Sequence, residues 1–168
     1  MKVQVLMLEQ DDPKKCTAAK LVKFGLVDRT KNISKKTIVL DPFSPNYLFS
    51  SDKNLANVIS AIDCSWNHAQ STFLKKFSHL PRKLPPLLAG NPVNYSKINK
   101  LTTVEALSGA LFILGFKEKS RELLDKFKWG HTFFELNQYL LDDYSKVQSR
   151  DEIDSIIAEY SLPSPEIF

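Results

Sequence analysis

The spacing of hydrophobic residues changes near residue 90 of this chain. Before that point, the sequence holds short apolar runs that end abruptly in polar or turn-forming residues, at residues 3–8, 37–40, 58–62 and 87–89. Runs of this length between turn signals predict buried strands. Helical patterns lie between the runs, at residues 13–24, 51–57 and 67–77. Strands that alternate with helices indicate a parallel sheet, so the first half is predicted to be α/β.

The first of these helices has clear predicted boundaries. Asp12 suits the N-cap position, and Pro13 suits the first helical position, where a missing N–H group costs nothing. Gly25 is expected to end the helix, because glycine readily adopts the left-handed conformation that follows a helix C-terminus.

After residue 90 the apolar residues recur at intervals of three and four, which is typical of amphipathic helices. Thr102 and Glu105 have the spacing of a capping box, and Gly130 separates two helical patterns. Four helices are predicted, at residues 102–114, 119–127, 132–147 and 151–160. We divide the chain into an α/β domain at residues 1–90 and a closely packed helical domain at residues 91–168.

Composition excludes several classes of protein. With five glycines, the chain has neither a GxGxxG nor a GxxxxGK[ST] motif, so neither of these phosphate-binding loops is present. Cys16 and Cys64 lack the spacing of zinc ligands; scattered thiols are typical of a reducing cytosol, although a disulfide between them stays open. The longest uncharged apolar stretch, at residues 106–116, is too short to span a bilayer. We therefore expect a cytoplasmic protein without a metal site or a membrane segment.

Charge is distributed unevenly along the chain. Residues 1–133 hold 21 Lys and Arg against 11 Asp and Glu, a net charge of +10. Residues 134–168 hold 2 against 8, a net charge of −6. A basic body with an acidic end is typical of proteins that bind a polyanion, but solvated surface lysines produce the same pattern. Charge by itself identifies no partner.

Asp63 is the leading candidate for chemistry, because it lies where a predicted strand ends, three residues before Trp66. Ligands of open α/β sheets bind beyond the carboxyl ends of the strands, where a carboxylate can act as a base or orient a cationic ligand. The same position suits a residue that caps the next helix, and Trp66 fits either a ligand pocket or the core. The three histidines show no metal-binding or triad spacing, at positions His68, His79 and His131.

Five short motifs follow one another along the chain: Asp-Pro-Lys-Lys-Cys-Thr at residues 12–17, Ile-Asp-Cys-Ser-Trp at 62–66, Asn-Pro-Val-Asn-Tyr at 91–95, Glu-Ala at 105–106 and Phe-Lys-Trp-Gly at 127–130. Together they resemble the small-subunit rRNA aminocarboxypropyltransferases of ribosome biogenesis, in their archaeal form. The resemblance implies a SPOUT-like fold with a parallel sheet, a helical C-terminal half and a deep trefoil knot. It also implies a protein that works as a monomer.

The activity implied by this resemblance uses S-adenosylmethionine as co-substrate and no metal. The 3-amino-3-carboxypropyl group moves to N3 of a pseudouridine, or of its N1-methyl form, in small-subunit rRNA, and methylthioadenosine leaves. An apolar pocket around the methyl group would decide which group moves, because the carbon aligned with the nucleophile reacts. Two alternatives stay open: a SPOUT-type RNA methyltransferase, and a non-enzymatic assembly factor that binds pre-ribosomal RNA.

The resemblance also assigns residues to these roles. The methyl group is expected to lie against Trp66 and Ala69. Other contacts with the cofactor are expected from Thr17, Ile62, Asp63, Leu84 and Thr103. RNA is expected to meet a basic face formed by Lys14, Lys15, Lys20 and Lys23. We expect Asp63 to orient the cofactor first and to act as a base second, because an ordinary aspartate is too acidic for this proton transfer.

The sequence departs from the family pattern at three positions. Gln10 stands where relatives often carry histidine, and Ser96 stands where they often carry glycine. Asn99 stands where they often carry tyrosine, so we expect its cofactor contact to come from the backbone. Asp63, Trp66 and Thr103 all match the pattern, so the expected cofactor site is intact.

Overall fold

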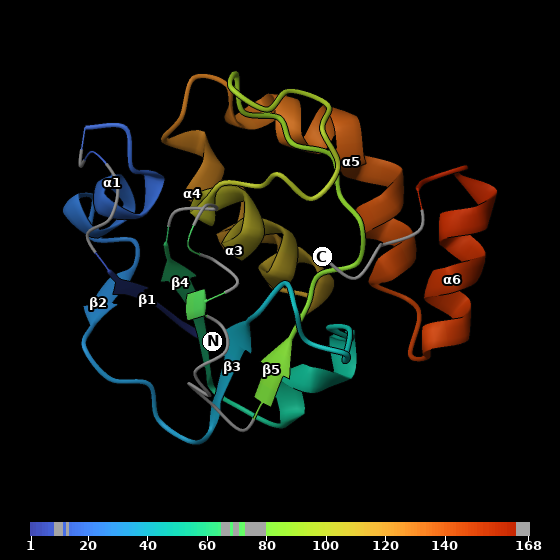
Figure 1. The fold of residues 1–168 in the computed structure, drawn as a ribbon, viewed down its shortest axis with the longest axis horizontal. Coiled ribbons are helices and arrows are strands. Elements are labelled where there is room, and N and C mark those ends of the chain that lie inside the picture. The colour runs from blue at the N-terminus through green and yellow to red at the C-terminus, as the bar shows by residue number, and fades with distance from the viewer. Residues whose placement is uncertain (9–11, 13, 65–67, 69–70, 73–79, 164–168) are drawn as a thin grey trace.

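The computed structural model describes residues 1–8, 12, 14–64, 68, 71–72 and 80–163 (Figure 1). Within these residues, five strands form one sheet in which every pairing is parallel, in the order β2-β1-β4-β3-β5. The strands are β1 (Lys2–Met7), β2 (Asp28–Thr30), β3 (Thr37–Leu40), β4 (Val58–Asp63) and β5 (Leu80–Arg82). The described residues therefore have the predicted α/β architecture with a parallel sheet.

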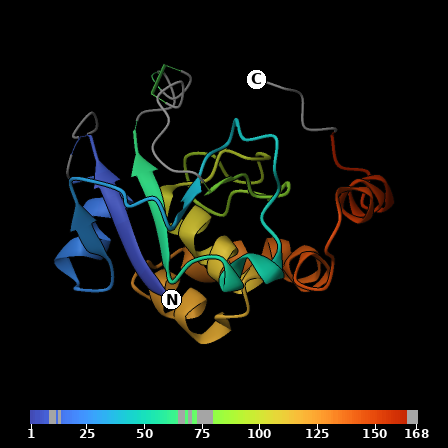
Figure 2. The same ribbon diagram turned by 90° about the horizontal axis from the view of Figure 1, so that it is seen from below.

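The helices gather around one central element. They are α1 (Thr17–Lys23), the 3₁₀ helix η1 (Ser50–Asn54), α3 (Thr103–Ile113), α4 (Lys117–Asp125), α5 (Gly130–Tyr144) and α6 (Arg150–Glu159). Helix α3 packs against β4, α1, α4 and α5, and α6 lies at the far end of the molecule from the sheet (Figure 2). No helix in the described part of the chain combines the length and the hydrophobicity needed to cross a membrane.

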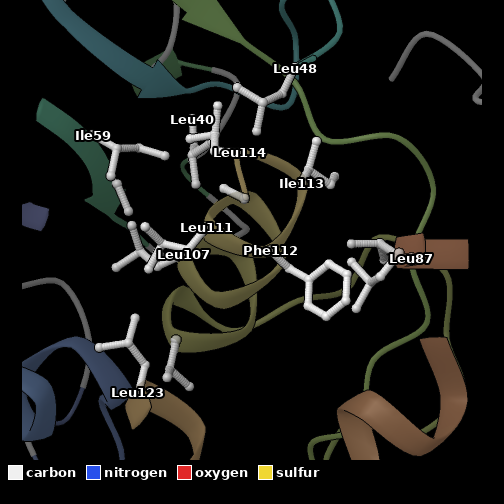
Figure 3. Close-up of a cluster of buried hydrophobic side chains, with 14 of the residues drawn as sticks. Leu40, Leu48, Ile59, Leu87, Leu107, Leu111, Phe112, Ile113, Leu114 and Leu123 are labelled. Carbon is white, nitrogen blue, oxygen red and sulfur yellow. The ribbon is translucent and has the colours of Figure 1, made fainter. Parts of the chain in front are cut away.

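The core is built around α3, which is buried on nearly all sides. Leu107 and Leu111 of this helix lie on the side of Ile59 of β4, whereas Phe112 lies beside Leu87 on the other side of the helix (Figure 3). A helix that is apolar all round belongs in the interior, because it has no face suited to water. One continuous cluster of buried side chains thus includes residues from both halves of the chain.

Three of the four predicted strands are confirmed as β1, β3 and β4. The predicted strand at residues 87–89 is wrong, since these residues make one isolated antiparallel bridge, between Leu88 and Ile98. The Asn137 side chain instead accepts a hydrogen bond from Leu88 N and donates one to Leu88 O, both at 2.8 Å. The Asn137 amide thus makes the two hydrogen bonds to the Leu88 backbone that a neighbouring strand would make. The short strands β2 and β5 were not predicted, because neither contains an apolar run.

The first helix begins later than predicted. Cys16, not Asp12, is its N-cap, and the Cys16 sulfur accepts a hydrogen bond from Ala19 N at 3.3 Å. Asp12 forms a preceding turn, in which its carboxylate accepts a hydrogen bond from Lys14 N at 3.0 Å. Gly25 ends the helix as predicted, with a φ of +69°.

Of the two other helices predicted in the first half, the one at residues 51–57 is wrong in type and length. It is a 3₁₀ helix over Ser50–Asn54, in which the Asp52 carboxylate accepts a hydrogen bond from Phe49 N at 2.9 Å. Most of the helix predicted at residues 67–77 lies outside the described residues.

All four predicted C-terminal helices are present as α3 to α6. The capping box of α3 is confirmed, because Thr102 Oγ1 accepts from Glu105 N while the Glu105 carboxylate accepts from Thr102 N. Gly130 does not separate α4 from α5 as predicted but is the first residue of α5. Its lack of a side chain is required there, because a Cβ atom would collide with the Leu124 carbonyl oxygen.

Candidate functional site

The carboxyl ends of β1 and β4 are the candidate ligand site of this sheet. These strands are neighbours, with Met7 paired to Asp63, and their arrows point the same way in Figure 2. After β1 the chain continues to β2 on one side, whereas after β4 it continues to β5 on the other. Ligands of open α/β sheets bind where the chain direction divides in this way. Asp63, the last residue of β4, lies at this switch point.

Both carboxylate oxygens of Asp63 accept hydrogen bonds from other elements. The Cys16 thiol donates to Oδ2 at 3.0 Å, and the Thr103 hydroxyl donates to Oδ1 at 2.9 Å. Cys16 is the N-cap of α1 and Thr103 is the first residue of α3. The carboxylate, which is half-buried, is therefore held where β4 and the starts of two helices meet.

Sequence reasoning missed the structural role of Cys16. Burial, followed by the hydrogen bond to the Asp63 carboxylate, raises the pKa of the Cys16 thiol from 9.0 to about 11. The thiol is therefore protonated at neutral pH and can act as the donor to Asp63. The sequence pointed to Cys16 only through its place in the first motif, next to Thr17. The motif could not show that Cys16 contacts Asp63.

The structure brings together four of the residues predicted to contact the cofactor, and Asp63 is one of them. Thr17 Oγ1 accepts a hydrogen bond from Val104 N at 3.3 Å, which ties the start of α1 to the start of α3. Thr17 thus lies beside Thr103, and Thr103 contacts Asp63. Ile62 precedes Asp63 in β4 and is buried. Their contacts with a ligand stay predictions.

The remaining predicted contacts lie in other parts of the chain. Leu84 is half-buried and follows β5, which is separated from β4 by one strand. Asn99 Oδ1 accepts a hydrogen bond from Leu87 N at 3.3 Å, and Asn99 N donates to Leu87 O at 2.9 Å. The Asn99 side chain is therefore occupied in holding the segment at residue 87. Trp66 and Ala69, the expected methyl pocket, lie outside the described residues.

Glu105 is a second carboxylate whose importance the sequence showed only in part. It is fully buried and accepts hydrogen bonds from Gly90 N, from Asn91 N and Nδ2, and from the backbone and hydroxyl of Thr102, at 2.6–3.0 Å. The capping box predicted only the bonds with Thr102. The other donors belong to the segment that precedes α3, so Glu105 fixes this segment against the start of the helix.

The four lysines of the predicted basic face are all exposed, on α1 or on the turn before it: Lys14, Lys15, Lys20 and Lys23. Phe127 lies in the connection between α4 and α5, and Lys20 Nζ of α1 lies 6.0 Å from the centre of its ring. Among the described residues, no three His, Cys, Asp or Glu side chains are grouped closely enough to hold a metal ion.

Two family models match the chain. The model described as "Ribosome biogenesis protein, C-terminal" matches residues 38–161, which is most of the chain. The model described as "Possible Fer4-like domain in RNase L inhibitor, RLI" matches residues 1–32. This second segment contains one cysteine, Cys16, whereas an iron–sulfur cluster takes four cysteine ligands. The match therefore gives no support for such a cluster.

Curated relatives and a solved structure agree with the larger match. The 16S rRNA aminocarboxypropyltransferase of Methanococcoides burtonii is 40% identical over 94% of each chain. That of Sulfurisphaera tokodaii is 40% identical over 98% of this chain and 100% of the relative. The structure of the SAM-dependent rRNA:acp-transferase Tsr3 from Vulcanisaeta distributa matches with a TM-score of 0.84 and 35% identity, over 96% of this chain and 89% of that chain. The chain therefore belongs to the family of archaeal 16S rRNA aminocarboxypropyltransferases.

Proposed function

We propose that this protein transfers the 3-amino-3-carboxypropyl group of S-adenosylmethionine to N3 of a pseudouridine, or of N1-methylpseudouridine, in small-subunit rRNA. Methylthioadenosine is the second product. One observation carries the proposal: the Asp63 carboxylate is held at the switch point of the sheet by Cys16 and Thr103. Identity of 40% over nearly the whole chain to enzymes named for this transfer supports the same conclusion.

The residues around Asp63 suit S-adenosylmethionine. When bound, this co-substrate supplies a carbon next to a sulfonium, which is a good leaving group. The negative charge of Asp63 stabilises the positive charges of the sulfonium and of the amino group. Two hydrogen bonds fix the Asp63 carboxylate in advance, so that little freedom is lost when the ligand binds. The hydroxyls of Thr17 and Thr103 offer polar partners at the same place.

The choice of the transferred group is a question of orientation. We propose that Trp66 and Ala69 enclose the methyl group, and that Ile62, Leu84 and the backbone at Asn99 line the rest of the cofactor site. With the methyl group enclosed, the aminocarboxypropyl arm is the one aligned with the acceptor nitrogen. Asp63 orients this arm first and takes the proton of the acceptor second.

Two labelled forms of S-adenosylmethionine test the proposed reaction. The protein is incubated with 16S rRNA transcribed in vitro, and with the same RNA carrying pseudouridine, using carboxyl-labelled or methyl-labelled co-substrate. We expect the carboxyl label alone to enter the pseudouridine-containing RNA, because the transferred arm carries the carboxyl carbon. The RNA without pseudouridine is the control.

Each alternative function predicts a different outcome. Entry of the methyl label would identify an RNA methyltransferase. Binding of RNA without entry of either label, together with no heat of binding for S-adenosylmethionine, would identify a non-enzymatic assembly factor.

The basic face is proposed to meet the phosphate backbone of the RNA. Lys20→Glu or Lys23→Glu is expected to weaken RNA binding while leaving the affinity for S-adenosylmethionine unchanged, because both side chains are exposed. Each lost phosphate contact lowers the slope of log affinity against log salt concentration by about 0.7–0.9. Filter binding at several salt concentrations measures this slope.

A matched control is Lys146→Glu, which changes an exposed lysine paired with Asp143 at the acidic end of the chain. We expect it to leave the salt slope unchanged. Equal losses of RNA and cofactor affinity in the Lys20 and Lys23 variants would contradict a separate RNA-binding face.

We further propose that the protein is a monomer with a SPOUT-like trefoil knot and acts in the cytoplasm, where ribosomal subunits assemble. The knot is proposed because the family to which the chain belongs implies it. The bond between Asp63 and Thr103 supports a cofactor site shared by residues 1–90 and 91–168.

A further inference from the structure

The turn at residues 92–97 exposes two hydrophobic side chains, Val93 and Tyr95. Val93 is 83% exposed and Tyr95 is 58% exposed, although the segment just before the turn is buried. An isolated exposed apolar residue needs no explanation, but two on one turn form a candidate contact surface. The proposed cofactor and basic-face residues do not include either of them.

This turn is fixed rather than loosely attached. The Asn91 side chain accepts a hydrogen bond from Asn94 N at 3.0 Å and donates one to Glu105 at 2.9 Å. Ser96 N donates to Ala89 O at 2.7 Å. The exposed Tyr95 ring is therefore presented on a backbone that is already ordered, which lowers the entropy cost of binding a partner.

Strain at Ser96 is consistent with a turn held in one conformation. Its φ is +61°, in the left-handed region that favours glycine. This conformation explains why glycine suits the position in the family pattern. The hydrogen bonds of the turn maintain it here despite the serine side chain.

The lysines near the turn favour an anionic partner. Gly90 lies against the start of α5, where an added Cβ would come within 2.5 Å of Phe133 N. Exposed Lys126 and Lys128 belong to the connection that leads into α5, and Phe127 in this connection lies next to Lys20 of the basic face. Lys97 of the turn is also exposed. Figure 1 shows this connection and the turn at the upper side of the molecule, with α1 at its left.

The turn is also connected to the proposed active site. The Glu105 carboxylate accepts hydrogen bonds from Asn91 N, directly before the turn, and from Thr102 N, directly before Thr103. Thr103 in turn donates to Asp63. A partner that contacts the turn is therefore positioned by the same hydrogen-bonded network that holds the proposed catalytic carboxylate.

We propose that the turn at residues 92–97 binds rRNA, with Tyr95 stacked on an unpaired base and Lys97 contacting a phosphate. The inference rests on the proposed function and names the surface that holds RNA next to its modified nucleotide. An aromatic ring amid basic side chains is the combination that binds single-stranded nucleic acid. Enzymes that modify a base act on it after it has left the base stack of the nucleic acid. The bases next to the modified one then have an open face on which an aromatic side chain can stack.

Three variants test this surface in filter binding to 16S rRNA transcribed in vitro. Tyr95→Ala is expected to weaken binding about 5- to 150-fold, the range of one base stacked on an aromatic ring. Tyr95→Phe is expected to bind like the wild type, because it keeps the ring. Tyr139→Ala is the matched control, because Tyr139 is 76% exposed on α5 in the acidic end of the chain and is expected to have no effect.

Salt dependence separates stacking from a change in charge. Tyr95→Ala is expected to lower the affinity at every salt concentration without changing the slope, whereas Lys97→Glu is expected to lower the slope. The affinity of Tyr95→Ala for S-adenosylmethionine, measured by calorimetry, is expected to equal that of the wild type, which shows that the site is intact.

Wild-type affinity of Tyr95→Ala for RNA would overturn the inference, as would an equal loss for Tyr139→Ala or a loss of cofactor affinity. Failure of the proposed function gives a different result. In that case the wild-type protein itself transfers no carboxyl label to RNA, whatever Tyr95 does.

Discussion

Replacing Asp63 with alanine is expected to lower the affinity for S-adenosylmethionine about 10- to 150-fold, and to lower turnover further. A hydrogen bond to a charged group contributes about 1.5–3 kcal/mol, which corresponds to this range of affinity. The substitution also leaves the Cys16 thiol and the Thr103 hydroxyl without the acceptor that joins α1 and α3. Calorimetry measures the affinity, and entry of the carboxyl label into RNA measures turnover.

Two further variants show which property of Asp63 matters. Asp63→Asn keeps the size of the side chain and removes its charge, so a loss of affinity close to that of Asp63→Ala would assign the effect to charge. Cys16→Ala keeps the charge and removes one of the two donors, and is expected to have a smaller effect on both measurements. Normal cofactor affinity with lost turnover in Asp63→Ala would contradict an orienting role and leave Asp63 as a base alone.

Replacing Glu105 with alanine is expected to destabilise the whole fold. The carboxylate is fully buried, and its loss leaves three buried donors without their acceptor: Gly90 N, Asn91 N and Asn91 Nδ2. A buried donor without a partner costs about 1–3 kcal/mol, so we expect a loss of at least about 3 kcal/mol in the free energy of unfolding. For a chain of this size, that loss corresponds to a decrease of about 6–12 °C in Tm. Calorimetric unfolding measures it.

Glu152→Ala is the matched control for this change. Glu152 occupies the same position in the capping box of α6 that Glu105 occupies in α3, but it is exposed. Its loss is expected to lower Tm far less, because water replaces the missing hydrogen bonds. Similar decreases in Tm for the two variants would show that Glu105 acts only as a helix cap and does not hold the segment before α3.

The elements that depend on local sequence could be predicted. The strands β1, β3 and β4 are apolar runs bounded by turn residues, and the start of α3 is a capping box formed by residues three positions apart. The position of Asp63 at the end of a strand follows from the same pattern. These features depend on interactions between residues that are close in the chain, which a sequence pattern records directly.

The sequence by itself therefore determined the α/β class, the C-terminal helices and the residues worth testing. Only the tertiary structure decided that Asn137 holds Leu88 in place of a strand, because those residues are 49 positions apart. It alone joined Cys16 to Asp63 across 47 positions, and Glu105 to Gly90 and Asn91, which lead into the turn that exposes Tyr95. Such contacts are set by how the core brings distant segments together, and no local pattern encodes them.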